Sequence, residues 1–268
     1  MKMAFIGGGA MGEAILAAVL SQGLSRPSDI TVSDIKEARR QYLAEKHGVA
    51  VTGDSRQAVV GSDIVILAIK PQNLAEAMPA LDGQLGPSQL VLSIIAGARI
   101  DTLSRGLSHN CIVRVMPNTP AQIGQGMSVW TATPGVSEQQ KQWAGSILGS
   151  MGREVYVDDE KYLDMATAVS GSGPAYVFLL LEALVSAAVD IGLPPDVAAE
   201  LALQTIIGAG HLVRETDRPP AELRRMVTSP GGTTAAALAR FEEGGFTDLV
   251  KRAVTAAYDR AKELGGSK

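Results

Sequence analysis

The sequence predicts an α/β domain with a doubly wound sheet, followed by an all-α domain. In residues 1–158, short β-branched runs alternate with helical stretches, and strands spaced in this way pair in parallel through crossover helices. After residue 158 no convincing strand pattern occurs, and helical patterns follow one another. We therefore expect one domain over residues 1–158 and a second, all-helical domain over residues 159–268.

Seven segments of the first domain are predicted strands. Five of them precede loops, namely Met3–Gly7, Ile30–Ser33, Ile64–Ile69, Leu90–Ile95 and Cys111–Met116. Two more, Met127–Thr131 and Glu154–Val157, flank a helix expected at Ser137–Met151. The continuous apolar run of the third segment is typical of a strand that helices cover on both faces.

Six helical patterns make up the second domain. They are Tyr162–Val169, Pro174–Ile191, Pro195–Glu215, Pro220–Val227, Thr233–Glu243 and Phe246–Leu264. The first two long helices are apolar around most of their circumference, more than a helix on the surface of one chain requires. We expect a second copy of the chain to cover them, so the protein should be at least a dimer.

The composition excludes several classes of function. A formal net charge of −4 argues against nucleic acid as a partner. The only cysteine, Cys111, excludes an intrachain disulfide, and none of the three histidines has a metal-ligand partner at a useful spacing. The longest apolar stretch, Tyr176–Gly192, contains two acidic residues and is too short to span a bilayer, and no secretory signal is visible. We expect a cytoplasmic protein with no metal, nucleic acid or membrane partner.

A glycine-rich segment follows the first predicted strand. It reads Ile6-Gly7-Gly8-Gly9-Ala10-Met11-Gly12 and leads into an amphipathic helix, and Asp34 follows about 20 residues later at the end of the second strand. This combination is the fingerprint of a Rossmann dinucleotide-binding unit. Gly7 would permit the turn, Gly9 would let the pyrophosphate approach the helix, and Gly12 would let the helix pack on the strand. An ordinary tight turn is the alternative, and the flanking elements favour the dinucleotide.

The sequence predicts the dinucleotide site more sharply than it predicts the choice between NADH and NADPH. Asp34 would hydrogen-bond the adenosine ribose and repel a 2′-phosphate, which favours NADH. Arg39 and Arg40 follow within two helical turns and could compensate for that repulsion, although a solvated helix face explains them equally well. NADPH and NADH are therefore both expected cofactors.

Three further loops leave the carboxyl ends of predicted strands, where doubly wound sheets bind ligands. One presents Lys70 before a proline, one presents Asn118 between two prolines, and one closes a strand with the small residues around Ala96. Rigid connectors are the alternative for the first two. The cofactor-binding residues expected at this edge are Ile6, Gly7, Gly8, Gly9, Ala10, Met11, Gly12, Ser33, Asp34, Ala68, Ile69, Lys70, Pro71, Ile95, Ala96 and Asn118.

A polar loop near the C-terminal end opens directly into an alanine-rich helix. It reads Val227-Thr228-Ser229-Pro230-Gly231-Gly232-Thr233-Thr234. Such a turn exposes backbone N–H groups at the positive end of a helix dipole and surrounds them with hydroxyls, which suits a small anion such as a carboxylate. A simple N-cap is the alternative, but the glycine pair and the threonine pair together exceed what a cap needs.

The catalytic groups that are missing narrow the chemistry. The chain shows no Ser-His-Asp arrangement, no nucleophile elbow and no obvious general acid. A nicotinamide enzyme without such an acid suits a protonated imine, because the C=N carbon is already electrophilic and reduction leaves an amine.

Together these motifs resemble the pyrroline-5-carboxylate reductase family over essentially the whole chain. The segments that carry the resemblance are Ile6–Gly12, Ala68–Pro71, Arg114–Pro120, Ser170–Tyr176 and Val227–Thr234. The resemblance implies a Rossmann domain, a helical dimerisation domain, and homodimers that assemble into larger rings. It implies NAD(P)H-dependent reduction of L-1-pyrroline-5-carboxylate to L-proline, the last step of proline biosynthesis.

The resemblance also implies roles for individual residues. Those implied to surround the substrate carboxylate are Ser229, Gly231, Gly232 and Thr233, while Thr234 is implied to be catalytic through a hydrogen bond to the ring nitrogen. Residues 170–176 would support the same pocket, with a small-residue helix contact as the alternative. Ser55 would lie at the adenosine ribose, where many family members have Asn, and many carry Ser or Asn with Arg near Asp34.

Two other functions stay open. One is a reductase of another imine or of a β-hydroxyacid; the β-hydroxyacid enzymes typically place a catalytic lysine on the long helix of the second domain, and Tyr176–Gly192 contains none. The other is a non-catalytic nucleotide-sensing protein, which would keep Gly7–Gly12 but has no need of the loop at Ser229–Thr234.

Overall fold

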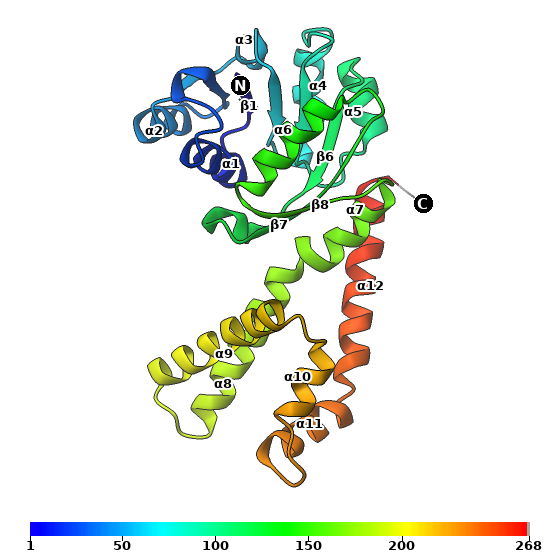
Figure 1. The fold of residues 1–268 in the computed structure, drawn as a ribbon. Helices are drawn as coiled ribbons and strands as arrows, with labels where there is room; N and C mark the ends of the chain where they lie inside the picture. The colour runs from blue at the N-terminus through cyan, green and yellow to red at the C-terminus, as the bar shows by residue number, and fades with distance from the viewer. Residues whose placement is uncertain (267–268) are drawn as a thin grey trace. The chain divides into compact units, whose positions relative to one another are not determined.

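The computed structural model describes residues 1–266 and divides the chain into two compact units (Figure 1). The first unit comprises residues 1–172 together with the end of the last helix from residue 257, and the second comprises residues 173–256. The boundary expected after residue 158 lies before this division, because the next helical turns pack with the first unit. A functional boundary at residue 158 stays a prediction.

The first unit is built on an eight-stranded sheet in the order β3-β2-β1-β4-β5-β6-β7-β8. The strands are β1 (Met3–Ile6), β2 (Ile30–Ser33), β3 (Ala50–Thr52), β4 (Ile64–Leu67), β5 (Leu90–Ser93), β6 (Ile112–Met116), β7 (Gly126–Ala132) and β8 (Gly152–Tyr156). All neighbours pair in parallel except β6 and β7. The direction of strand addition reverses between β1 and β4, which is the place where such sheets bind dinucleotides.

Two features of the sheet were not expected from the sequence. β3 is a three-residue strand with no buried residue, so its pattern is too short to recognise. β7 runs antiparallel to β6 because only the short 3₁₀ helix η3 (Thr119–Ile123) and a few flanking residues connect them, too few for a crossover.

Helices cover both faces of the sheet and bury two apolar clusters. One cluster joins Met3 and Phe5 of β1 to helices α1 (Ala10–Ser21), α2 (Glu37–His47) and α6 (Glu138–Gly149). The other joins Ala4 and Ile6 to helices α3 (Ser55–Val59), α4 (Leu74–Leu81) and α5 (Ile100–Leu107). Alternate residues of β1 therefore serve opposite faces, as the two-residue period of a strand requires.

The second unit is all-helical. Its helices are α8 (Gly173–Asp190), α9 (Pro195–Thr216), α10 (Pro220–Met226), α11 (Thr233–Glu243) and the first part of α12 (Phe246–Leu264). α8 and α9 pack against each other, yet α8 has no buried residue within this chain. Its side chains Phe178 and Leu179 are 56% and 67% exposed, so a large apolar face stays uncovered by the single chain.

The helix that leads into the second unit is longer than the sequence indicated. A π-helical turn, η4 (Thr167–Gly171), follows α7 (Lys161–Ala166), and only Ser172 lies between it and α8. By length and composition alone, the resulting run Lys161–Asp190 is long and apolar enough to cross a membrane, and its most apolar window is not buried inside the chain. The core helices of soluble proteins pass the same test of length and composition, and an interface with a second copy would leave this face exposed in the single chain.

Candidate active site

The loops that follow β1, β2 and β4 meet at the carboxyl edge of the parallel strands. The Gly7 N–H donates to the Ser33 carbonyl at 2.8 Å, and the Ala68 N–H donates to the Ile6 carbonyl at 2.8 Å. The ends of β1, β2 and β4 are therefore adjacent, at the point where the strand order reverses. Residues expected at the cofactor site that lie at this edge are Ile6, Gly7, Gly8, Gly9, Ser33, Asp34, Ala68, Ile69, Ile95 and Ala96.

Glycine is required or favoured at Gly7, Gly9 and Gly12 for a different steric reason at each position. Gly7 has φ +100°, and a Cβ there would lie 2.7 Å from the Ala68 carbonyl oxygen. A Cβ on Gly12 would lie 2.5 Å from the Gly7 carbonyl oxygen, so helix and strand can approach only without it. A Cβ on Gly9 would meet no atom within 4 Å. The N-terminus of α1 is therefore open to a ligand at Gly9, as a pyrophosphate site requires.

The Asp34 carboxylate is held firmly at the end of β2. Its Oδ2 accepts a hydrogen bond from the Gly8 N–H at 2.9 Å, and its Oδ1 accepts one from the Lys36 N–H at 2.9 Å. Next to it, the hydroxyl oxygens of Ser33 and Ser55 lie 3.2 Å apart. A carboxylate has lone pairs beyond these two bonds, so Asp34 can still accept hydrogen bonds from ribose hydroxyls.

A charged cluster that the sequence analysis did not identify lies beside the glycine loop. Glu13, in the first turn of α1, accepts hydrogen bonds from Arg39 and Lys46 of α2, and the His47 ring lies 3.2 Å from it. Burial alone would raise the pKa of Glu13, but hydrogen bonds from Lys46, Arg39 and His47 outweigh it and lower the pKa to about 2. Glu13 is therefore ionised throughout the neutral range.

The remaining expected cofactor residues differ in what they can offer. The Lys70 side chain is exposed at the end of β4, before the 3₁₀ turn η2 (Pro71–Asn73). Ile95 is only 2% exposed, so it could contribute its backbone alone. The Asn118 amide is already engaged, because it donates to the Ser170 carbonyl at 3.0 Å and accepts from the Met127 N–H at 2.8 Å. In this structure Asn118 braces the π-turn η4, and a cofactor role for it stays a prediction.

Ion pairs around the buried side chains of Arg114 and Asp164 hold α7 against the sheet. Arg114 of β6, 4% exposed, pairs with Glu160 at 2.7 Å and with Asp164 at 3.3 Å. Asp164 also pairs with Arg99 at 3.2 Å. The two cations and two carboxylates balance one another, which is the condition under which buried charges are tolerated.

The polar loop of the second unit begins α11. Gly231 has φ +70°, and Gly232 is the N-cap residue, so no side chain caps this helix start. A Cβ on Gly232 would lie 2.5 Å from the Ser229 hydroxyl oxygen, which explains the second glycine. Within the described part of the chain, the hydroxyls of Thr233 and Thr234 have no hydrogen-bond partner that the structure records, unlike Thr228, which donates to the Arg224 carbonyl at 2.6 Å. The loop therefore offers donors to an anion, and the assigned roles of Ser229–Thr234 stay predictions.

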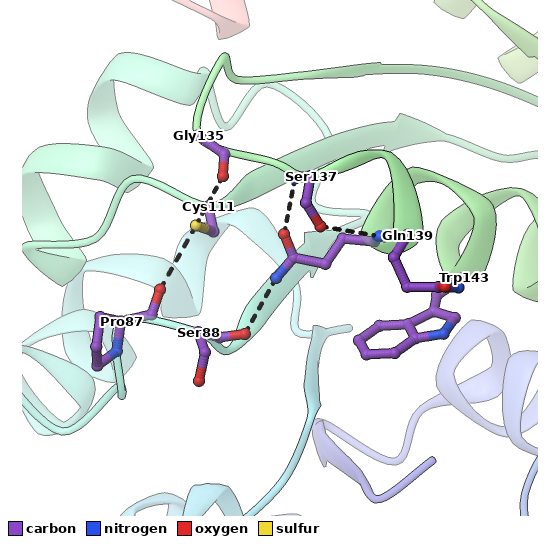
Figure 2. Close-up of a pocket in the computed structure, with 8 residues that line it drawn as sticks. Pro87, Ser88, Cys111, Gly135, Ser137, Gln139 and Trp143 are labelled. Carbon is purple, nitrogen blue, oxygen red and sulfur yellow. Dashed lines mark hydrogen bonds between the residues drawn. The ribbon is translucent and has the colours of Figure 1, made fainter.

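A separate cavity of about 390 Å³ lies at the opposite, amino edge of the sheet (Figure 2). Cys111 lies in its wall, with its sulfur 3.2 Å from the Gly135 carbonyl oxygen and 3.6 Å from that of Pro87. The Gln140 side chain donates to the Ser88 carbonyl at 3.0 Å in the same wall. This cavity is distinct from the dinucleotide edge, because it precedes β5 and β6 rather than following them.

Among residues 1–266, no group of three or more metal-ligating side chains is brought together.

Two family models match parts of the chain. The family model described as pyrroline-5-carboxylate reductase dimerisation matches residues 160–264, and the one described as NADP oxidoreductase, coenzyme F420-dependent, matches residues 2–97. The pyrroline-5-carboxylate reductase of Synechocystis sp. is 42% identical over 265 residues, covering 99% of this chain and 98% of that protein.

Solved structures agree with the sequence relatives. The fold is similar to a pyrroline-5-carboxylate reductase from Coxiella burnetii, with a TM-score of 0.91, 37% identity, and coverage of 100% of this chain and 98% of that one. It is also similar to Plasmodium falciparum pyrroline carboxylate reductase with NADP bound, with a TM-score of 0.89, 31% identity, and coverage of 99% and 98%. The chain belongs to the pyrroline-5-carboxylate reductase family.

Proposed function

We propose that the chain reduces L-1-pyrroline-5-carboxylate to L-proline with NADPH or NADH, as the last step of proline biosynthesis. The observation that carries this proposal is the 42% identity to a pyrroline-5-carboxylate reductase over 99% of the chain. The geometry supports it, because a dinucleotide edge and an uncapped, hydroxyl-rich helix start are both present.

The edge of the first unit fits a dinucleotide. The open space at Gly9 admits a pyrophosphate to the N-terminus of α1, where backbone N–H groups and the helix dipole favour a negative charge. Asp34 and the paired hydroxyls of Ser33 and Ser55 offer hydrogen bonds to the adenosine ribose. When bound, the reduced nicotinamide supplies the hydride.

The start of α11 fits the substrate. The backbone around Gly231 and Gly232, with the hydroxyls of Ser229 and Thr233, would hold the carboxylate. The Thr234 hydroxyl would then hydrogen-bond the ring nitrogen and orient the ring. Hydride addition to the C=N carbon moves the π-electron pair onto that nitrogen, so a protonated imine becomes a neutral amine. Such a site has little charge to stabilise, and its task is positioning.

The test is oxidation of NADH or NADPH, followed at the nicotinamide absorbance band with pyrroline-5-carboxylate added. Thr234→Ala should lower kcat/KM about 10²-fold, or about 2.7 kcal/mol, the lower end for one positioned proton donor, while dinucleotide affinity stays unchanged. Thr228→Ala is the matched control, because its hydroxyl is occupied by the Arg224 carbonyl; it should keep near wild-type turnover.

Two results would contradict the proposal at different levels. Near wild-type turnover of Thr234→Ala would mean that this threonine is structural. Absence of turnover by the wild-type protein with both dinucleotides would instead favour a reductase of another imine or of a β-hydroxyacid, or a nucleotide-sensing protein.

We further propose that the working form is a homodimer, assembled into a ring of dimers, in the cytoplasm. The dimer is supported by the match of residues 160–264 to a dimerisation family and by the uncovered apolar face of α8. The ring rests on the family resemblance, and the location rests on the use of a single cysteine.

A further inference from the structure

Glu13 holds the cations of α2 beside the glycine loop. Its Oε1 accepts a hydrogen bond from Lys46 Nζ at 2.8 Å and one from the Tyr42 hydroxyl at 3.2 Å, and the His47 Nε2 lies 3.2 Å away. Its Oε2 pairs with Arg39 Nη2. The side chains of Glu13 and Arg39 are only 16% and 25% exposed, so water screens this pair less than a surface pair.

Arg39 lies next to the place where an adenosine ribose would bind. Its Nε donates to the Gly8 carbonyl, and the N–H of the same Gly8 donates to the Asp34 carboxylate at 2.9 Å. One residue of backbone therefore links the guanidinium to the carboxylate expected to hold the ribose hydroxyls. NADPH differs from NADH by a 2′-phosphate at that ribose, where Asp34 is repulsive and a nearby arginine is the residue type that offsets the repulsion.

The other cations at this end are arranged differently. Arg56 is bound by the Asp54 carboxylate, 2.8 Å from its Nη2. Arg40 donates to the main-chain carbonyl of Asp34 at 2.7 Å, and the Lys36 side chain is exposed. Arg39 differs from these three cations because it pairs with a carboxylate outside the ribose loop, that of Glu13 on α1, which it shares with Lys46.

We propose that Glu13 is a specificity-determining residue for the dinucleotide. By holding Arg39 it withholds that cation from a 2′-phosphate, and so weakens binding of NADPH relative to NADH. The proposal rests on the dinucleotide site of the proposed function but not on the pyrroline substrate.

The test uses two fragments that differ only in the phosphate, ADP-ribose and 2′-phospho-ADP-ribose, titrated calorimetrically into the full-length protein. Glu13→Gln keeps the shape of the side chain and removes its charge. It should tighten binding of 2′-phospho-ADP-ribose by about fivefold or more and leave ADP-ribose within about twofold, with a gain that shrinks as salt rises.

Glu45→Gln is the matched control. Glu45 is an exposed residue of α2, the helix that carries Arg39, and among residues 1–266 the structure records no ion pair for it, so the net charge changes equally without release of Arg39. Its ratio of the two affinities should move less than twofold. Arg39→Gln supplies a second test. In the Glu13→Gln background, Arg39→Gln should abolish the gain in affinity for 2′-phospho-ADP-ribose. In the wild-type background, Arg39→Gln should have a much smaller effect on the ratio of the two affinities.

The outcomes are separable. An unchanged ratio in Glu13→Gln, with ADP-ribose still bound, would overturn the proposal and leave Glu13 as a brace between α1 and α2. A gain that persists after Arg39→Gln, or that Glu45→Gln reproduces, would also overturn it, because net charge alone would then explain the effect. Failure of the wild-type protein to bind either fragment would instead remove the dinucleotide site.

Discussion

Replacement of Gly9 by valine should separate cofactor binding from folding. Gly9 has φ −63° and ψ −176°, an extended conformation open to any residue, and an added Cβ meets no atom within 4 Å. The space it would fill is the approach to the first N–H groups of α1. Loss of one hydrogen bond from such a donor to a charged pyrophosphate costs about 1.5–3 kcal/mol. We therefore expect dinucleotide affinity to fall at least about tenfold, or about 1.4 kcal/mol.

The assay is titration of the variant with NADH and with NADPH, beside thermal unfolding without cofactor. The unfolding free energy should fall by no more than about 1–2 kcal/mol, because valine is a poorer N-cap residue than glycine but its Cβ meets no atom within 4 Å. Gly12→Ala is the contrasting variant, since its Cβ would lie 2.5 Å from the Gly7 carbonyl oxygen and should destabilise the fold by about 1–3 kcal/mol. Unchanged dinucleotide affinity in a stably folded Gly9→Val protein would refute the assignment of this loop.

Three further predictions concern assembly and stability. Sedimentation at micromolar concentration should show at least a dimer, and an active 27.9 kDa monomer would contradict the reading of the apolar helices. Asp164→Ala should lower the unfolding free energy by about 3 kcal/mol in urea titrations, because it unbalances buried Arg114, while Asp101→Ala at an exposed pair should cost less than about 1 kcal/mol. The pKa of Glu13 is about 2 in the folded chain, below its ordinary value of 4.5. The stability that ionised Glu13 gives the fold is therefore fully present above pH 4.5 and is lost as the pH falls from 4.5 towards 2. Glu13→Gln should lose less stability than wild type across that window, and equal losses would contradict the ion-pair account.

The sheet was predictable where burial leaves a continuous signal. β1, β4 and β5 are buried at every position, and their residues are apolar except for Ser93 at the end of β5. β3 has no such signal because it is a three-residue edge strand, and the antiparallel direction of β7 depends on the length of one connection. The gap expected between helices ending at Val169 and beginning at Pro174 is shorter in the structure, because a π-turn carries the helix through Gly171 and only Ser172 precedes α8.

The site was predictable where its contacts are local. Gly7, Gly12 and Asp34 make their contacts within the glycine-rich turn or at the ends of neighbouring strands. The spacing of the motif along the sequence therefore indicates where these contacts form. Glu13 was missed because its partners on α2 follow 26 to 34 residues later, and only the packing of α1 against α2 brings them together. The engagement of the Asn118 amide by Ser170 was hidden for the same reason, at a separation of 52 residues.

The start of α11 shows how the competing interpretations of the polar loop can be weighed. A helix that begins in solvent leaves its first N–H groups without intrahelical partners, and a serine, threonine, aspartate or asparagine at the N-cap position is the usual remedy. Here that position is Gly232, and the structure records no side-chain cap. The hydroxyl groups are displaced to either side, at Ser229 before the cap and at Thr233 and Thr234 after it. A sequence selected only to cap the helix would gain from moving one hydroxyl onto the cap, whereas one that must leave those N–H groups free for a carboxylate would keep glycine there.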